Sequence, residues 1–326
     1  MANIKDVARK AGVGIATVSR VINHSGYVKK ETREKIERVI RECGYVPNEI
    51  ARSMTAQKNM IIAFMIPNTT HRFFGELLYH VEMELGQRGY KTMVCSSSEQ
   101  LEKEIAYIDM LKKNRVDALI LLTNNDIEPY LDRRFPLVSF DRRFKGVPCV
   151  TSDNYEGGVL AARHLIESGC QHLMFVGDDA QGGKVEVITD VDKRRKGFFD
   201  ELKRQGYPDA VDIEYPLGNY ITLPKHVHRR IASYPEVDGI FAISDSVAAE
   251  VIKNIERSGR RVPEDVRVIG YDGGTSFLNL GKRITSIEQP TDRIARAFGE
   301  VIQGYYDNHR TGDRIIPVKL IKGDTT

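Results

Sequence analysis

Residues 4–23, IKDVARKAGVGIATVSRVIN, decide the fold of the amino-terminal end of the chain. The first half has apolar residues at helical spacing, which places them on one helix face, and Asn3 before it is a suitable N-cap. Gly12 lies where this helix must end and the chain must turn, which favours a residue that tolerates positive φ. The apolar positions of this first helix are Ile4, Val7, Ala8 and Ala11.

The second half of the stretch, residues 15–23, repeats the helical pattern with Val18, Val21 and Ile22 on its apolar face. A small residue where two helices cross, a turn glycine and a branched apolar residue together indicate a helix-turn-helix. The opposite face of the second helix is predicted to contact DNA. A small amphipathic helix pair with a solvated polar face would show the same pattern, so the motif alone leaves both interpretations open.

The residues of this polar face suit different parts of a DNA duplex. Arg20 can make a bidentate contact to guanine, and Ile15 and Ala16 can contact a thymine methyl group. Thr17 and Ser19 can hydrogen-bond to phosphate oxygens, which positions the helix without reading sequence.

A third helix is predicted at residues 31–43, and GYVPNEIARSM follows it at residues 44–54. With the helix-turn-helix before them, these segments closely resemble the headpiece and hinge of the LacI/GalR family of bacterial transcription regulators. The resemblance implies a hinge helix at about residues 48–54, which orders when two subunits sit on operator DNA and wedges an apolar side chain into the minor groove.

Two residues depart from the family pattern. Met54 stands where the family has the wedging leucine, and its similar size should still allow insertion. Gly14 stands where the family has a serine that caps the recognition helix and touches phosphate; glycine is an acceptable N-cap, but that contact is weakened or lost. The predicted DNA-binding residues are Asn3, Ile15, Ala16, Thr17, Ser19, Arg20, Asn23, Tyr45, Asn48, Ala51, Arg52 and Met54.

Charge is distributed unevenly along the 326 residues, whose formal net charge is +3. Residues 1–58 hold 12 lysines and arginines against 6 acidic residues, whereas the remainder holds 36 against 39. A basic headpiece on a slightly acidic body suits phosphate binding without general adhesion to nucleic acid. The helical periodicity of the basic end argues against a solubilising tail.

Cysteine usage and the absence of targeting signals predict an intracellular protein. The four cysteines form no CxxC and show no metal-like spacing with histidine, so we expect reduced thiols. The amino terminus lacks the apolar region of a signal peptide, and no apolar run reaches the length of a membrane span. We therefore expect a cytoplasmic protein, unlike the periplasmic sugar-binding proteins that its body resembles.

From Met60 onward, short buried strands alternate with amphipathic helices, and the alternation restarts near residue 173. This pattern predicts parallel sheets with helices on both faces, and two such runs predict two doubly wound lobes. We thus expect an α/β protein: a helix-turn-helix three-helix headpiece, a hinge helix, and a two-lobed parallel-sheet core like that of periplasmic sugar-binding proteins. The chain should end with a helix at 292–307 and a strand at 317–321.

These patterns also set the expected domain boundaries. The DNA-binding headpiece is predicted at residues 1–46, the hinge helix with its linker at 47–59, and the effector-binding and dimerisation core at 60–326. The lobes of this core are assigned about 60–154 with 290–317 (amino-terminal) and about 155–289 with 318–326 (carboxy-terminal).

Ligands of doubly wound sheets bind beyond the carboxyl ends of the strands, and in a two-lobed protein those ends face a shared cleft. Carboxylates and a guanidinium can each hold two vicinal hydroxyls there, while an aromatic ring covers an apolar sugar face. Residues just after the strands are therefore effector-site candidates, and the family's effector positions fall on much the same set: Asn68, Phe73, Phe74, Asp141, Arg194, Tyr220, Ser244, Asp245, Asp272 and Gln289. The resemblance adds Asp190, where the family often has a small hydroxyl residue.

Several candidates have a second interpretation. Phe73 and Phe74 open a helix and could belong to the core. Asp141 and Asp272 could cap the turns that follow them. Arg194 lies in the basic run KRRK, and only its spacing from Gly-Phe, which matches the family's R-x-x-G-F, singles it out.

An enzyme is the main alternative from another class, because doubly wound lobes often bind nucleotides. The chain has no GxGxxG after a strand and no GxxxxGK[ST], and residues 177–183 have neither spacing. No Ser/His/acid or Cys/His set is apparent, and the scattered histidines, His71 among them, are expected at the surface or the cleft edge. We predict no catalytic residue, no metal and no cofactor.

The function expected from these features is repression of a carbohydrate-utilisation operon, relieved by a small sugar or sugar phosphate. A corepressor-dependent regulator is the alternative, with a purine-type ligand or a phosphorylated carrier protein as effector. Two headpieces must meet two half-sites of a near-palindromic operator, so we expect a homodimer. No membrane contact is expected.

Overall fold

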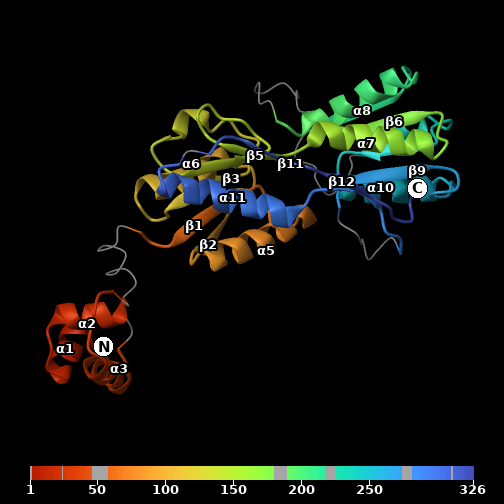
Figure 1. Ribbon diagram of the computed structural model, residues 1–326. Helices are drawn as coiled ribbons and strands as arrows, with labels where there is room; N and C mark the ends of the chain where they lie inside the picture. Colours follow the sequence, from red (N-terminus) through yellow and green to blue (C-terminus); the bar gives the residue numbers. More distant parts are fainter. Residues whose placement is uncertain are drawn as a thin grey trace. The chain divides into compact units, whose positions relative to one another are not determined.

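The computed structural model describes residues 2–23, 25–45, 58–179, 189–216, 225–273, 281–309 and 311–326. The chain divides into two compact units, Met1–Asn59 and Met60–Thr326 (Figure 1). Helices make up the first unit as far as it is described, and the second unit contains two six-stranded sheets. This organisation confirms the predicted fold class. Over the described ranges, no helix combines the length and apolar character needed to cross a membrane.

Local sequence signals begin and end the helices of the first unit. The side chain of Asn3 accepts hydrogen bonds from the backbone N–H groups of Lys5 and Asp6, and Asp6 completes a capping box. Gly12 ends the first helix with a φ of 65°, as its position predicts. The helices are α1 (Ile4–Ala11), α2 (Ile15–Ile22) and α3 (Lys30–Cys43). They share a core of Val7, Ala8, Ala11, Val18, Val21, Ile36 and Val39.

The first sheet of the second unit has the strand order β11-β5-β4-β3-β1-β2, and every pair of neighbours is parallel. Its strands are β1 (Ile61–Ile66), β2 (Lys91–Ser96), β3 (Ala118–Leu121), β4 (Leu137–Phe140), β5 (Cys149–Ser152) and β11 (Arg314–Ile316). Its helices are α5 (Arg72–Gln87), α6 (Leu101–Lys112), the 3-10 turn η1 (Glu128–Tyr130) and α11 (Thr291–Tyr306). Phe64 packs in one core with α5 and α11, whereas its neighbour Met65 packs in another with α6. Because successive strand residues point to opposite faces, helices cover both sides of this sheet.

The second sheet has the order β12-β10-β9-β8-β6-β7 and is parallel except for β12, which runs antiparallel to β10. Its strands are β6 (Leu173–Asp179), β7 (Val211–Pro216), β8 (Gly239–Ala242), β9 (Arg267–Asp272), β10 (Thr285–Glu288) and β12 (Lys319–Ile321). Its helices are α7 (Asn154–Glu167), α8 (Asp192–Arg204), α9 (Lys225–Ala232) and α10 (Asp245–Arg257). In β9, Tyr271 faces the start of α7 and Gly270 faces the start of α10, so these two helices cover opposite faces.

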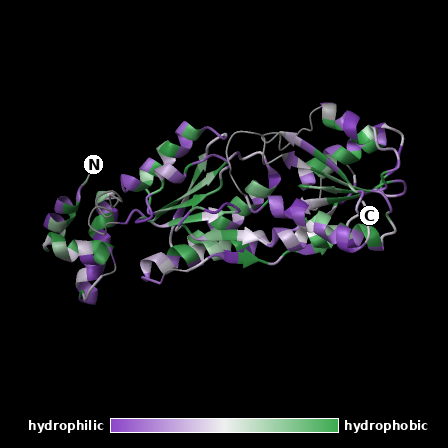
Figure 2. Cartoon of the chain, turned by 90° about the horizontal axis from the view of Figure 1, so that it is seen from above, coloured by the Kyte–Doolittle hydropathy of each residue, from purple (hydrophilic) through white to green (hydrophobic). Residues whose placement is uncertain are grey.

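We call the first sheet with α5, α6 and α11 the first lobe, and the second sheet with α7 to α10 the second lobe. Figure 2 shows the strands of both lobes as mostly hydrophobic, and the helices around them as mixed along their length. This contrast follows from burial, because the central strands are covered on both faces and the helices on one.

The described chain crosses between the lobes three times: from β5 to α7, from β10 to α11, and from β11 to β12. The first two crossings are joined by a hydrogen bond of 2.6 Å from Ser152 Oγ to Gln289 Oε1. The strand predicted at residues 317–321 is wrong in its extent. Two short strands, one in each lobe, flank Pro317 and Val318 instead, since proline has no N–H to donate to a ladder.

Helices α7 and α8 approach each other so closely that two glycines are required. A Cβ atom at Gly197 would lie 2.0 Å from the backbone oxygen of Tyr155, and one at Gly158 would lie 2.0 Å from that of Arg194. The Gly-Phe pair that follows Arg194 in the sequence therefore has a packing explanation: the glycine admits α7, and Phe198 is fully buried.

Gly197→Ala should lower the free energy of unfolding by roughly 1–3 kcal/mol or more, because the added methyl group overpacks the α7–α8 contact. The matched control is Gly86→Ala on α5, where nothing lies within 4 Å of an added Cβ. That change should be neutral or stabilise by up to about 1 kcal/mol through helix propensity. Urea unfolding followed by circular dichroism measures both variants, and equal stabilities would contradict the close contact.

Candidate functional site

The polar face of α2 is accessible, and its apolar face is buried against α1 and α3. Val18 and Val21 lie in the core, and Asn23 Nδ2 donates a hydrogen bond of 3.2 Å to Ser19 Oγ. Gly14 is the N-cap of α2 and makes no side-chain capping bond. The residues predicted to read DNA from this helix are exposed or half-buried: Ile15, Ala16, Thr17, Ser19, Arg20 and Asn23.

The remaining residues predicted to bind DNA fall into two groups. Asn3 caps α1, and Tyr45 packs partly against the helical core while its N–H donates to the carbonyl of Ile40 at 3.1 Å. The hinge residues Asn48, Ala51, Arg52 and Met54 lie outside the described residues, so their roles stay predictions from the sequence.

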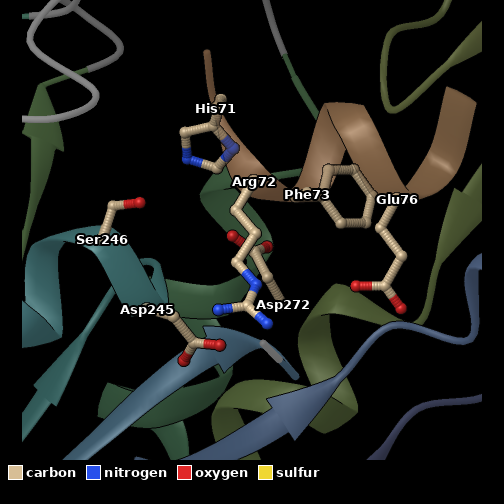
Figure 3. A pocket seen from close by; sticks show the side chains of 7 residues that line it. All are labelled: His71, Arg72, Phe73, Glu76, Asp245, Ser246 and Asp272. Atoms are coloured by element: carbon tan, nitrogen blue, oxygen red, sulfur yellow. The ribbon is translucent and has the colours of Figure 1, made fainter. Parts of the chain in front are cut away.

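A pocket of about 230 Å³, open at its mouth, lies between the lobes of the second unit (Figure 3). The start of α5 forms one wall, and the start of α10 and the end of β9 form the other. Its lining residues are His71, Arg72, Phe73 and Glu76 from the first lobe and Asp245, Ser246 and Asp272 from the second. This is the place that the carboxyl-end rule predicts for a ligand.

Arg194 lies next to Asp272 of this pocket, and its side chain is almost completely buried. Its Nε donates to Asn154 Oδ1 at 2.7 Å, and its Nη1 donates to the carbonyl of Ile243 at 2.9 Å. The guanidinium carbon lies 3.6 Å from the ring centroid of Tyr271, a cation–π contact. Arg194 is therefore fixed in position by a carbonyl, an amide and an aromatic face.

Two buried carboxylates, one from each lobe, flank this guanidinium. Asp141 Oδ2 and Asp272 Oδ1 each lie 3.9 Å from a terminal nitrogen of Arg194. Asp141 accepts hydrogen bonds from Thr151 Oγ1 at 2.7 Å and Asn154 Nδ2 at 3.0 Å. Asp272 is likewise held by a side chain from another element, because its Oδ1 accepts a hydrogen bond from Gln289 Nε2 at 2.8 Å.

The backbone at these two aspartates is strained. Their φ angles are 52° for Asp141 and 108° for Asp272, in the region that side-chain-bearing residues rarely adopt. Such conformations persist only where the surroundings impose them, and they concentrate at binding and catalytic sites. In this protein the strain aims both carboxylates at the same guanidinium.

Burial shifts the titration of the groups around the pocket. Burial raises the pKa of Asp141 and Asp272 above the usual range of a carboxyl group, and the opposing charge of Arg194 only partly offsets it. Burial lowers the pKa of His71, outweighing the charge of Asp272, so its imidazole is neutral at neutral pH. The pocket thus combines costly buried charges with a neutral donor and acceptor, a combination typical of ligand sites.

Aromatic rings form the apolar part of the site. Phe73 lies 5.9 Å from Phe140 between ring centroids, in a stacked arrangement. Phe74 is half-buried, with its ring 5.0 Å from that of His71 and 5.9 Å from that of Phe73. Phe73 therefore serves both the core and the pocket, which joins the two interpretations that the sequence left open.

Three other candidates have local structural partners. Asn68 Oδ1 accepts hydrogen bonds from Thr70 and from the N–H of His71 at 2.9 Å, which shapes the turn before α5. Ser244 caps α10, and Asp245 Oδ1 accepts from Ser286 Oγ at 2.6 Å. Tyr220 lies outside the described residues.

Asp190 is placed away from the pocket lining, in an ion pair between the lobes. Its buried carboxylate lies 2.9 Å from Arg143 of the first lobe and 2.7 Å from Lys193 of α8. Its N–H also donates to the carbonyl of Asp141 at 2.7 Å. Burial alone would raise the pKa of Asp190, but the hydrogen bonds from Lys193 and Arg143 hold it below its usual range.

Sequence reasoning missed several residues that the structure brings to the site. His71, expected at the surface or cleft edge, is 6% exposed and lines the pocket with Arg72 and Glu76. Part of this set could have been found from helical spacing around the predicted residue Phe73. Arg72 and Glu76 are four residues apart and therefore lie on one helix face beside it. Asn154 and Tyr271, which hold Arg194, were not predicted either, although Tyr271 directly precedes the predicted residue Asp272.

Over the described residues, no group of three or more His, Cys, Asp or Glu side chains is arranged to hold a metal ion. Hydroxyl-rich ligands suit the groups that are present: carboxylates, a neutral imidazole and an aromatic ring.

A helix-turn-helix unit together with a two-lobed, pocket-bearing unit defines a ligand-responsive DNA-binding regulator. The family of bacterial regulatory proteins of the lacI family matches residues 3–48, and the periplasmic binding protein-like domain matches residues 162–326. The chain therefore belongs to the LacI family, as the full-length relatives below also show, and it is a transcription regulator, not an enzyme.

Known proteins resemble this chain along its whole length. The sucrose operon repressor of Streptococcus mutans is 33% identical, covering 100% of this chain and 99% of the relative. The ribose operon repressor of Bacillus subtilis is 35% identical over the same shares. The solved structure of a transcriptional regulator CelR–cellobiose complex is 26% identical with a TM-score of 0.71, and 100% of each chain is covered.

Asp272→Asn should leave the ligand-free protein at least as stable as the parent at pH 7. The folded-state pKa of Asp272 lies above its unfolded value of about 3.9. The contribution of this group to stability therefore falls as pH rises from about 4 through the raised pKa, and asparagine removes that loss. Thermal unfolding between pH 4 and pH 8 measures the difference, with exposed Asp209→Asn as the control. A variant whose relative stability declines with increasing pH would contradict the assignment.

Arg20→Ala should weaken operator binding by about 1–3 kcal/mol and reduce the discrimination between operator and random duplex. Arg38→Ala, at an exposed position on α3, changes the charge equally and should reduce affinity for both duplexes by similar factors. Fluorescence anisotropy with an operator selected from a random library measures both effects. An unchanged specificity ratio in Arg20→Ala would remove this residue from base recognition.

Proposed function

We propose that this protein is a homodimeric cytoplasmic repressor of a carbohydrate operon, which releases a near-palindromic operator when a small sugar occupies the interlobe pocket. The observation that carries this proposal is the placement of Asp141 and Asp272, from different lobes, around the guanidinium of Arg194 beside the pocket. The relatives named for sucrose and ribose operons support the same class of effector.

The effector residues that we propose suit a polyhydroxylated ring. A carboxylate can accept from two vicinal hydroxyl groups, and a guanidinium donates in a fixed planar geometry. Phe73 offers an apolar surface for the C–H face of a sugar, and neutral His71 offers one donor and one acceptor. The proposed set otherwise keeps the predicted residues, with Asn68, Phe74, Ser244, Asp245, Gln289, Asp190 and Tyr220 as further members.

Release follows from linkage between the pocket and the DNA-binding unit. A ligand shifts DNA affinity only if it binds one arrangement of the protein better than the other. A sugar that contacts Arg72 in one lobe and Asp245 in the other favours the closed arrangement of the lobes. We propose that closure changes how the first lobes of two copies meet, and that this loosens the hinge helices and their headpieces from the operator.

A dimer and a cytoplasmic location are part of this proposal. Two helix-turn-helix units related by a two-fold axis match the two half-sites of a palindrome, one helical turn of DNA or a multiple apart. The operator is chromosomal, so the regulator must share its compartment.

Operator-bound protein should release DNA when the cognate sugar is added, and Asp272→Asn should stay bound at the same sugar concentration. The variant loses an acceptor for sugar hydroxyls, but its DNA-reading residues are untouched. Fluorescence anisotropy of a labelled operator, titrated with a panel of sugars, measures release. Equal operator affinity of the two proteins without sugar is the control.

Two results would change this view. If a ligand tightened operator binding, the protein would be a corepressor-dependent regulator. If no small molecule altered operator affinity, the proposed coupling would be wrong, whatever the affinity of the pocket.

A further inference from the structure

We propose that the pocket selects a neutral sugar of a single ring and rejects its phosphate esters, and that Glu76 determines this selectivity. The proposal rests on the sugar response put forward above and narrows its chemical class. Glu76 is not among the effector residues predicted from the sequence. It lines the pocket because of where α5 lies.

The described lining of the pocket is acidic. Glu76, Asp245 and Asp272 contribute three carboxylates, whereas Arg72 contributes one guanidinium and His71 is neutral. Adding the neighbouring pair Arg194 and Asp141 leaves this excess of two negative charges unchanged.

In the sequence, the segments of the second unit outside the described residues contain few charged side chains. Residues 180–188 contain one lysine and one glutamate, and residues 217–224 and 274–280 contain no charged residue. Residue 310 is an arginine. A phosphate ester would add up to two negative charges to a site that already has an excess of them, and like charges brought together disfavour binding.

The buried guanidinium beside the pocket is already matched to protein groups. Arg194 is held by Asn154 and the carbonyl of Ile243, with a carboxylate on each side. Figure 3 shows the Arg72 side chain extending across the pocket, toward the side on which Asp245 lies. Cations bind phosphate best where no carboxylate competes for them, and the carboxylates of this lining outnumber its cations.

Glu76 stands at the edge of the pocket. It is exposed, and one of its oxygens lies 3.5 Å from Thr291 Oγ1, at the start of α11. Burial is the main cause of the raised pKa of Asp272, and the charge of Glu76 raises it further, so the two carboxylates repel each other. Glu76 can accept a hydrogen bond from a hydroxyl group but not from a fully ionised phosphate.

The size of the pocket in this arrangement of the lobes favours a ligand of one ring. Its volume of about 230 Å³ includes the open mouth, whereas pockets for drug-sized ligands span roughly 300–1,000 Å³. A disaccharide would extend past the mouth.

The test uses the full chain and matched pairs of probes: D-ribose with D-ribose 5-phosphate, D-fructose with D-fructose 6-phosphate, and D-glucose with D-glucose 6-phosphate, with sucrose as the two-ring probe. Isothermal titration calorimetry gives each dissociation constant, and operator release gives a second readout. For the sugar that binds best, we expect its phosphate ester and sucrose to bind at least about tenfold more weakly.

Glu76→Gln should reduce the preference for the neutral sugar over its ester by about threefold or more, because one repelling charge is removed. Glu82→Gln, an exposed position on the same helix and away from the pocket, should leave the ratio unchanged. Operator affinity without sugar should be the same in both variants, which shows that each is folded.

Three results would overturn the inference. An ester that binds as tightly as its parent sugar, or sucrose binding better than every single-ring sugar, would refute the class of ligand while leaving the sugar response intact. A ratio equally unchanged in Glu76→Gln and Glu82→Gln would remove Glu76 as the determinant. Binding of no probe at all would refute the sugar response itself, and this inference with it.

Discussion

One buried guanidinium, that of Arg194, organises the junction of the lobes. Taking a charged group out of water costs several kcal/mol unless its hydrogen bonds and counter-charges are supplied by the protein. Here the amide of Asn154 and the carbonyl of Ile243 satisfy its donors, Tyr271 covers its face, and two aspartates balance its charge. Neither aspartate would be tolerated in the interior without it, so the proposed effector site depends on this side chain.

Much of the architecture could be predicted because its determinants are local. Asn3 and Gly12 begin and end a helix through contacts within a few residues, and alternating apolar segments define the strands. The rule that ligands bind past strand ends then identified Asp141 and Asp272 without knowledge of the lobes' arrangement. Such a rule needs only local signals, because parallel strands bring their ends to one edge of a sheet, whatever lies between them in sequence.

The features that could not be predicted depend on contacts between distant segments. His71 and Glu76 line the pocket because α5 begins opposite α10, which no local pattern encodes. Asp190 pairs with Arg143, 47 residues away, and so joins the lobes beside the pocket. Gly197 looked like part of a family motif, but its role is to let two helices touch.

The site and its surroundings have different tolerances for change. The cores of the lobes are built from apolar residues in contact on all sides, where size is what matters. Around Arg194, by contrast, the effect of a substitution depends on charge and hydrogen-bonding capacity, because each buried polar group needs its partner. A substitution that conserves volume is therefore acceptable in the first environment, whereas in the second its effect depends on the charge and the hydrogen bonds that it changes.

Three segments of the described chain connect the lobes. Two of these connections are joined by the hydrogen bond from Ser152 to Gln289. A single connection would let the lobes swivel freely about a point, whereas several parallel connections leave one easy axis of rotation. Three connections therefore favour rotation of the lobes about one axis over sideways sliding. Gln289 also donates a hydrogen bond to Asp272. A ligand that bound this carboxylate would therefore act directly on the connections between the lobes.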